Sequence, residues 1–293
     1  MKDYLIRGLA LNDEVRFFAC VTTNLVEEIR TRHNAYPTSI AAVGRVATVC
    51  SMMGAMQKSG DTIDIRVRGN GPIGQILATG NEKGEVRAYA NNMKVHLPSN
   101  KKGKLDVRGG VGDKGDIVII KDLGLTEKYT TTSPIISGEI AEDFTYYFAK
   151  SEQIPSAVSL GVLVNTDNSI LASGGFIIQV LPNASEKTIC HLEEKIKNIE
   201  PISSLINKKL SLEEIIKILF ENDYKILKEI PIVFKCSCSK EKYSKALITL
   251  GKKELLNLTK NETTETVCSF CNEKYYFTKE EIEKLIEKLI EKL

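Results

Sequence analysis

The sequence predicts three parts: an α+β domain over residues 1–181, a helical connector over 182–230 and a small cysteine-containing domain over 231–293. Its 293 residues exceed the roughly 50 to 200 that one domain usually holds. Strand-like alternation of apolar residues occurs before Leu181-Pro182 and gives way to helical spacing after it. Four cysteines then follow in two close pairs, which mark the last part.

The first domain is expected to combine helices with paired strands. Small and apolar residues recur at helical spacing over 37–56, which predicts a helix buried in the core. Apolar residues alternate with polar ones over 62–68 and lead into a Gly-Asn-Gly-Pro turn, which predicts a strand and a return strand over 73–79. The other candidates are strands over 85–90, 116–121 and 176–181 and a helix over 140–150. This mixture indicates an α+β fold.

The connector carries helical signals, and no strand is predicted in it. Four apolar residues keep helical spacing: Ile189, Leu192, Ile196 and Ile199. A second helix should begin after Ser211, because Glu214 stands at the capping-box position. Lysine and glutamate recur on the polar faces, which is more typical of a solvated surface than of a partner-binding face.

Composition excludes several classes of protein. The chain is 42% hydrophobic and 27% charged, as expected of a folded chain, and its formal charge of +2 gives no general field for nucleic acid or anionic membranes. Lys2, Asp3 and Arg7 interrupt the start of the chain, so we expect no secretory signal. No stretch is expected to approach the about 20 apolar residues that cross a bilayer. Closely paired cysteines suit a reducing compartment, so we expect a cytoplasmic protein.

The two cysteine pairs predict a metal site. Cys236-Ser-Cys238 and Cys268-Ser-Phe-Cys271 are separated by 29 residues, and two such turns can converge on one tetrahedral zinc ion. Because four thiolates fill all four positions, none remains for water or substrate, and catalysis by the metal is disfavoured. A final helix should begin at Thr278 with Glu281 completing its cap. Its apolar stripe consists of Ile282, Leu285, Ile286, Leu289 and Ile290.

Two interpretations of the cysteine cluster remain open at this point. Zinc could be a passive staple, because a domain of roughly 60 residues is marginally stable without one. It could also be a switch, since oxidation can pair neighbouring thiolates and remove the metal ligands two at a time. The second interpretation predicts a local transition from order to disorder.

The remaining candidate residues favour structural roles. Cys20, Cys50 and Cys190 stand alone and are predicted to be core thiols, and the three histidines lack a partner at ligand spacing. The glycine cluster over 109–115 is predicted to be a turn beside a strand, because Lys114 precedes glycine and not the serine or threonine of a phosphate loop. No catalytic constellation is predicted.

Several motifs together resemble those of one known family. They are Arg32-His33 with Pro37, Gly69-Asn70-Gly71-Pro72-Ile73-Gly74, Lys121-Asp122-Leu123-Gly124, Ser137-Gly138-Glu139-Ile140-Ala141-Glu142-Asp143, Ser151-Glu152-Gln153-Ile154-Pro155-Ser156 and Gly174-Gly175-Phe176. With the cysteine pairs they resemble the heat shock protein 33 family of redox-regulated holdase chaperones, over nearly the whole chain. The sequence departs from the family pattern at Arg87-Ala88-Tyr89 and after Tyr129, away from the cysteines.

The resemblance implies an ATP-independent chaperone and not an enzyme. It implies one zinc ion per chain in the reduced, inactive state, and activation through Cys236–Cys238 and Cys268–Cys271 disulfides with zinc release. It further implies a homodimer after oxidation, and a connector that covers the surface used to bind unfolded clients.

Two alternatives come from other classes of protein. A CxxC motif can exchange disulfides, but thiol oxidoreductases place it at the start of a helix in a thioredoxin-like context that the sequence does not indicate. A four-cysteine zinc ribbon can bind nucleic acid, and nearby lysines such as Lys252 and Lys253 supply some charge. Interleaved glutamates dilute that charge, so no nucleic-acid partner is expected.

Overall fold

The computed structural model describes residues 2–101 and 103–290. The chain forms two compact units, one running to Lys235 and the other beginning at Cys236. The predicted connector forms helices α5 to α7 and most of strand β10, all of them within the first unit.

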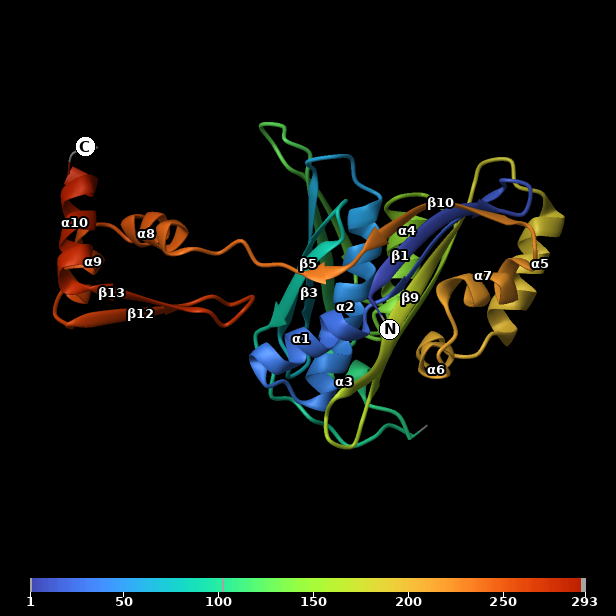
Figure 1. Ribbon diagram of the computed structural model, residues 1–293, viewed down its shortest axis with the longest axis horizontal. Coiled ribbons are helices and arrows are strands. Elements are labelled where there is room, and N and C mark those ends of the chain that lie inside the picture. The colour runs from blue at the N-terminus through green and yellow to red at the C-terminus, as the bar shows by residue number, and fades with distance from the viewer. Residues whose placement is uncertain (1, 102, 291–293) are drawn as a thin grey trace. The chain divides into compact units, whose positions relative to one another are not determined.

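Two β-sheets frame the first unit (Figure 1). The antiparallel five-stranded sheet has the order β10 (Tyr224–Pro231), β1 (Tyr4–Ala10), β2 (Val15–Val21), β9 (Ile170–Val180) and β8 (Ser156–Val164). The six-stranded sheet has the order β11 (Val233–Phe234), β5 (Glu85–Ala90), β4 (Gln75–Asn81), β3 (Thr62–Gly69), β6 (Gly115–Asp122) and β7 (Tyr129–Pro134). Its strands are antiparallel except for the β11–β5 pair.

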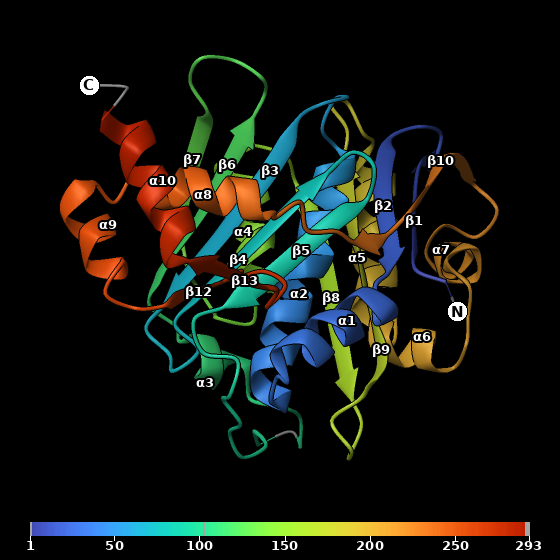
Figure 2. The ribbon, with the colours of Figure 1, turned by 60° about the vertical axis from the view of Figure 1, so that its left-hand side comes forward.

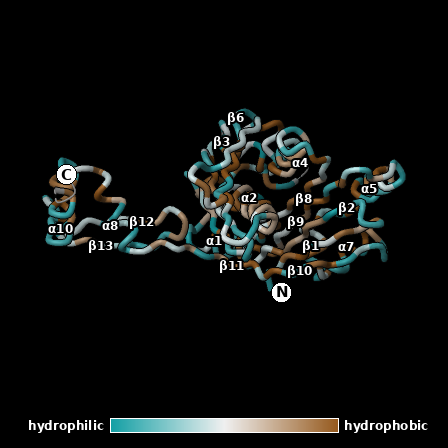
Figure 3. The backbone as a smooth tube through the Cα atoms, turned by 90° about the horizontal axis from the view of Figure 1, so that it is seen from above, coloured by the Kyte–Doolittle hydropathy of each residue, from teal (hydrophilic) through white to brown (hydrophobic). Residues whose placement is uncertain are grey.

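Helices lie between and outside these sheets. They are α1 (Thr23–His33), α2 (Pro37–Ala55), α3 (Val107–Val111), α4 (Ala141–Lys150), α5 (Glu186–Asn198), α6 (Ile202–Asn207) and α7 (Leu212–Phe220). Helix α2 contacts strands of both sheets and lies between them (Figure 2). One hydrophobic core surrounds α2, and a second joins the other face of the five-stranded sheet to α5–α7. Brown, hydrophobic stretches follow α2 and the neighbouring strands in Figure 3.

Helix α2 is buried on nearly every side. Gly44 permits this packing, because a Cβ atom there would lie 2.8 Å from Val26 Cγ1 and 2.9 Å from Val162 Cγ2. By length and composition this 19-residue helix could cross a membrane, so the expectation that no stretch comes near that length is wrong. However, 94% of the apolar stretch is buried inside the unit, which is typical of a core helix.

The α+β fold class is confirmed, and so are the helices predicted over 37–56 and 140–150 and the strands over 62–68, 85–90 and 116–121. The capping box is also confirmed, since Ser211 and Glu214 each accept the other's backbone N–H at the start of α7. The prediction of a connector without strands is wrong, because β10 pairs with β1. This edge strand is mostly exposed and carries charged residues, so it lacks the alternation that reveals half-buried strands.

The buried carboxyl group of Asp3 makes the stability of the first unit depend on pH. Its two oxygens accept the backbone N–H groups of Asn24 (3.0 Å) and Leu25 (2.7 Å) at the start of α1. Burial outweighs these hydrogen bonds and raises the pKa of Asp3 to about 6. Because the folded chain therefore binds this proton more tightly than the unfolded chain, the free energy of unfolding falls as pH rises from about 4 to about 6.

We expect this effect to reach about 3 kcal/mol and to disappear in Asp3→Asn, as measured by urea unfolding at pH 4 and pH 7. Asp13→Asn is the matched control, because Asp13 is exposed and its ion pair with Lys225 contributes little. An unchanged pH dependence in Asp3→Asn would contradict the assignment.

The second unit combines a β-hairpin with helices, of which the last packs against the second strand of the hairpin. Its elements are α8 (Lys240–Ile248), α9 (Lys252–Leu258), β12 (Thr263–Val267), β13 (Lys274–Thr278) and α10 (Lys279–Ile290). The predicted cap of the last helix is confirmed, since the Glu281 N–H donates to Thr278 Oγ1 and the Thr278 N–H donates to Glu281 Oε2. The small core contains Leu247, Leu255, Phe277, Ile282, Leu285 and Ile286, with Leu289 packed against it. The side chain of Ile290 lies outside the described part of the chain.

Candidate metal centre

The hairpin and the segment before α8 position the four cysteines. Cys268 and Cys271 lie in the turn between β12 and β13, where the Cys268 N–H donates to Glu273 O (2.9 Å) and the Asn272 N–H donates to Cys268 O (2.8 Å). Asn272 closes the turn with a φ of 58°, a left-handed conformation that asparagine tolerates. Cys236 and Cys238 lie in the extended segment that leads to Ser239, whose hydroxyl caps α8.

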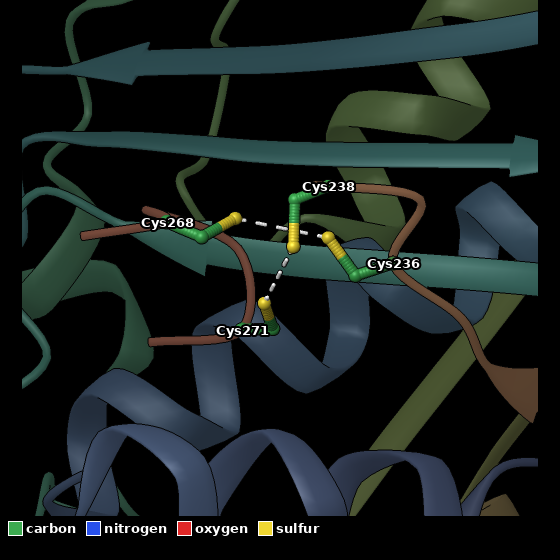
Figure 4. Close-up of side chains that lie close together, drawn as sticks. All are labelled: Cys236, Cys238, Cys268 and Cys271. Carbon is green, nitrogen blue, oxygen red and sulfur yellow. Dashed lines mark hydrogen bonds between the residues drawn. The ribbon is translucent and has the colours of Figure 1, made fainter. Parts of the chain in front are cut away.

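The four sulfur atoms point toward a common centre (Figure 4). All lie within 4.8 Å of one another, with 3.7 Å between the Sγ atoms of Cys236 and Cys268 and 3.3 Å between those of Cys238 and Cys271. These separations exceed the about 2.05 Å of a disulfide bond, so none of the four cysteines forms a disulfide. These two sulfur–sulfur contacts join one turn to the other.

This arrangement can hold a metal ion with all four sulfurs. In a tetrahedral site with metal–sulfur bonds of about 2.3 Å, neighbouring sulfurs stand about 3.8 Å apart, which resembles the separations here. The donor set is soft, and Cys268 and Cys271 are buried. Four sulfur ligands fill such a site, so the geometry favours holding a metal over catalysis by it.

Burial and hydrogen bonds tune the thiols differently. Burial disfavours the Cys268 thiolate, but hydrogen bonds from the backbone of Cys271 and from the Tyr243 hydroxyl outweigh it and lower the pKa of Cys268 to about 7. Burial raises the pKa of Cys238 and of Cys271. Cys268 is thus the thiol that most readily becomes the nucleophilic thiolate.

Polar contacts hold the extended segment in place. The Lys240 ammonium lies 2.6 Å from a carboxylate oxygen of Glu281 at the start of α10, and 5.1 Å from the centre of the Phe277 ring. The Lys242 ammonium donates to Ser237 O, between the first two cysteines. The Lys240 contacts tie the start of α8 to β13 and α10, and the Lys242 contact holds the extended segment against α8.

The Tyr275 hydroxyl donates to Cys238 Sγ over 3.1 Å, and sequence reasoning missed this residue. We expect Tyr275→Phe to weaken metal binding about tenfold, because a lost hydrogen bond to a ligand typically costs 10- to 100-fold in affinity. Competition with a chromophoric chelator measures this affinity. The matched control is Tyr276→Phe, whose ring points away and is 51% exposed. Equal affinities of the two variants would contradict a role for the Tyr275 hydroxyl.

The three lone cysteines differ in their burial. Cys20 and Cys50 are fully buried as predicted, and burial raises the pKa of Cys20 to about 12. The prediction is wrong for Cys190, which is exposed, because it lies on the side of α5 away from buried Leu192. Among the described residues, the four-cysteine cluster is the one group of three or more potential ligands close enough to share a metal ion.

The glycine cluster over 109–115 does not form a simple turn. Its first residues form the end of the short helix α3, whose start is capped by Asp106, and Gly115 is the first residue of β6. The prediction of a turn beside a strand is thus correct for its second half, where Gly112 and Gly115 have positive φ angles.

Comparisons with known proteins agree along nearly the whole chain. The family model described as Hsp33 protein matches residues 3–278. The 33 kDa chaperonin of Bacillus subtilis (strain 168) is 49% identical over 284 residues, 97% of this chain and 98% of that protein. That of Staphylococcus aureus (strain JH9) is 48% identical and covers 98% of this chain and 99% of its own length. The crystal structure of the 33 kDa chaperonin of Thermotoga maritima matches with a TM-score of 0.93 at 34% identity, over 99% of this chain and 100% of that one.

Fold and site define the class: a large α+β unit joined to a small unit that carries a cluster of four cysteines able to hold a metal ion. The comparisons then identify the family. The chain belongs to the Hsp33 family and is a chaperone, not an enzyme.

Proposed function

We propose that this chaperone is a redox-regulated, ATP-independent holdase that oxidants activate. The observation that carries the proposal is the convergence of four cysteine sulfurs within 4.8 Å in a small unit with little hydrophobic core. In the reduced state Cys236, Cys238, Cys268 and Cys271 would hold one zinc ion per chain. Zinc suits this set because it accepts four thiolates in a tetrahedron and has no redox chemistry that competes with theirs.

Oxidation would convert these ligands into two disulfides, Cys236–Cys238 and Cys268–Cys271. In each reaction two thiolates give two electrons to one peroxide molecule, which takes up two protons and leaves as two molecules of water. The low pKa of Cys268 favours it as the first thiolate to attack. The other pairings are geometrically open because all four sulfurs are close, so mapping the disulfides by mass spectrometry tests this assignment.

Loss of the metal ligands would unfold the second unit. Structural zinc contributes about 10 to 16 kcal/mol of apparent binding energy in small domains. The core of the second unit contains six buried apolar side chains among its described residues, too few to replace that contribution. Oxidation would thereby leave the chain after β11, from Cys236 onward, unfolded.

The connector over 182–230 would then uncover the client-binding surface. Its helix α7 covers the five-stranded sheet with Leu212, Ile215 and Leu219, and the rings of Phe220 and Phe17 stand 5.5 Å apart. Release of this helix exposes a continuous apolar face of the sheet, which suits unfolded proteins. We further propose that the oxidised chain forms a homodimer and acts in the cytoplasm, where reductants restore the thiols.

The position of the CxxC pair argues against an oxidoreductase. Cys268 and Cys271 lie in a hairpin turn and not at the start of a helix, where the helix dipole would activate a thiolate. No nucleic-acid partner is proposed.

The experiment follows zinc release with a chromophoric chelator and client aggregation by light scattering, before and after peroxide treatment at elevated temperature and without nucleotide. We expect about one zinc ion per chain to leave, and scattering to fall only after oxidation. Dithiothreitol should restore the thiols. The control Cys190→Ser, which lacks the exposed lone thiol, should behave like the wild type. If zinc stays bound, or leaves without effect on aggregation, the metal is a passive staple.

A further inference from the structure

Strand β8 is an edge strand without the usual protection against pairing. Its nine residues, Ser-Ala-Val-Ser-Leu-Gly-Val-Leu-Val, include neither a charged residue nor a proline. Native proteins normally protect sheet edges with charge, proline or short strands. The other edges of the described sheets follow this rule: β10 carries Lys225, Lys228, Glu229 and Pro231, β7 ends at Pro134, β11 has two residues, and β12 and β13 carry Glu265 and Lys274.

The register shows which backbone groups of β8 point outward. The Ser173 carbonyl of β9 accepts the Thr22 N–H, so the backbone N–H and C=O groups of Ser173 point away from β8. Because these groups alternate in direction along a strand, those of Ala172 and Gly174 point toward β8. Because Ser173 is paired with Val162, the N–H and C=O groups of Val158, Leu160 and Val162 point away from β9. Among the described residues, no backbone hydrogen bond from another segment reaches these three.

A cavity of about 780 Å³ runs along this edge. Residues 159–166 line it together with Tyr36, Arg45 and Leu105, and the start of α6 lines it through Ile202 and Ser203. Its lining includes the cations Arg45 and Lys104 but no aspartate or glutamate. Apolar side chains beside a row of backbone donors and acceptors are what an added β-strand requires.

We propose that β8 captures an extended segment of an unfolding client protein, which pairs with it as a sixth strand of the five-stranded sheet. This inference rests on the proposed holdase function and assigns one client-binding site to it. An unfolded chain suits the edge because its backbone is free to hydrogen bond, whereas folded proteins have already paired theirs. Arg45 is already paired with Glu139, so the positive charge of Lys104 is the one that favours neutral or acidic client segments.

Helix α6 couples this edge to the redox switch. It belongs to the connector and packs against β8 at Gly161, where an added Cβ would stand 2.8 Å from Ser203 Cβ. When oxidation releases the connector, α6 would leave the edge and widen the cavity. The reduced protein would therefore bind client segments at β8 more weakly.

Residue-resolved amide hydrogen exchange on the oxidised full-length chain tests the pairing. The probe is reduced, carboxymethylated α-lactalbumin, which stays unfolded and is acidic. We expect exchange at Val158, Leu160 and Val162 to slow at least tenfold when the probe is added. Exchange at Ala157, Ser159 and Gly161 should change little, because their amides already point toward β9.

A charged residue on the edge provides a second test. Ser159→Lys places an ammonium group in the cavity, and we expect it to raise the amount of chaperone needed to suppress aggregation at least fivefold. Thr132→Lys is the matched control on the edge strand β7, where the side chain is exposed. Zinc release and circular dichroism should be unchanged in both variants. Equal loss of holdase activity in the two would contradict the site.

Each other outcome overturns the inference in a distinguishable way. If the probe binds but the alternating protection is absent, clients bind elsewhere and the holdase function stands. If protection appears on oxidation without probe and grows with protein concentration, the occupant of β8 is a second copy of the chain. If the oxidised chain binds no unfolded protein, the proposed function fails and the client site fails with it.

Discussion

Cys268→Ser is expected to abolish stoichiometric zinc binding and to unfold the second unit without any oxidant. The substitution removes a buried ligand with a lowered pKa and leaves three thiols, which cannot complete the tetrahedron. Much of the about 10 to 16 kcal/mol that zinc contributes to such a domain would be lost. The variant should therefore suppress client aggregation partly even when reduced. Zinc content, limited proteolysis and tyrosine fluorescence measure the change, since the chain has no tryptophan.

The matched control for Cys268→Ser lies in the same turn. Ser269 is exposed between the cysteines, so Ser269→Ala should keep about one zinc ion per chain and a folded second unit. If Cys268→Ser also retained wild-type zinc content and resistance to proteolysis, the four-thiol centre would not stabilise this unit. If it lost zinc but stayed inactive until oxidised, the metal would stabilise the unit without controlling the chaperone.

The cysteine cluster was largely predictable because its signal is local. Two short cysteine spacings predict which residues come together without knowledge of the fold. The contacts of Cys236 with Cys268 and of Cys238 with Cys271 depend on how the hairpin folds back and lie beyond sequence reasoning. Tyr275 could have been found, since alternation along β13 places it on the same side as the buried Phe277.

The missed strands lacked the alternation that predicts a half-buried strand. β2 is buried on both faces between the two hydrophobic cores, so its sequence is apolar after Arg16 and gives no period of two. β10 fails for the opposite reason, because it is exposed and joins the sheet mainly through backbone pairing with β1. Helices α2, α4, α5, α7 and α10 were predicted, since their apolar spacing or caps lie within a few residues of one another, whereas α1, α3, α6, α8 and α9 were missed.

Asp143→Asn is expected to destabilise the first unit by about 3 to 4 kcal/mol, because hydrogen bonds to a buried charged group contribute about 1.5 to 3 kcal/mol each. The Asp143 carboxylate is fully buried and accepts the backbone N–H groups of Ile136 (2.8 Å), Ser137 (2.8 Å), Gly138 (3.3 Å) and Ile140 (2.9 Å). An asparagine NH₂ group would face at least one of these donors instead of accepting from it. The carboxylate also holds Ile140 at a φ of 69°, which is strained for a β-branched residue.

Urea unfolding followed by circular dichroism measures the loss of stability in Asp143→Asn. Glu142→Gln is the matched control on the same helix, since Glu142 is exposed and its change should alter the free energy of unfolding by less than about 0.5 kcal/mol. Zinc content should remain that of the wild type in both variants, because residue 143 lies in the first unit and the four thiols in the second. Equal stability of the two variants would show that the buried carboxylate does not organise the turn before α4. Zinc loss in Asp143→Asn alone would instead show that the two units fold as one.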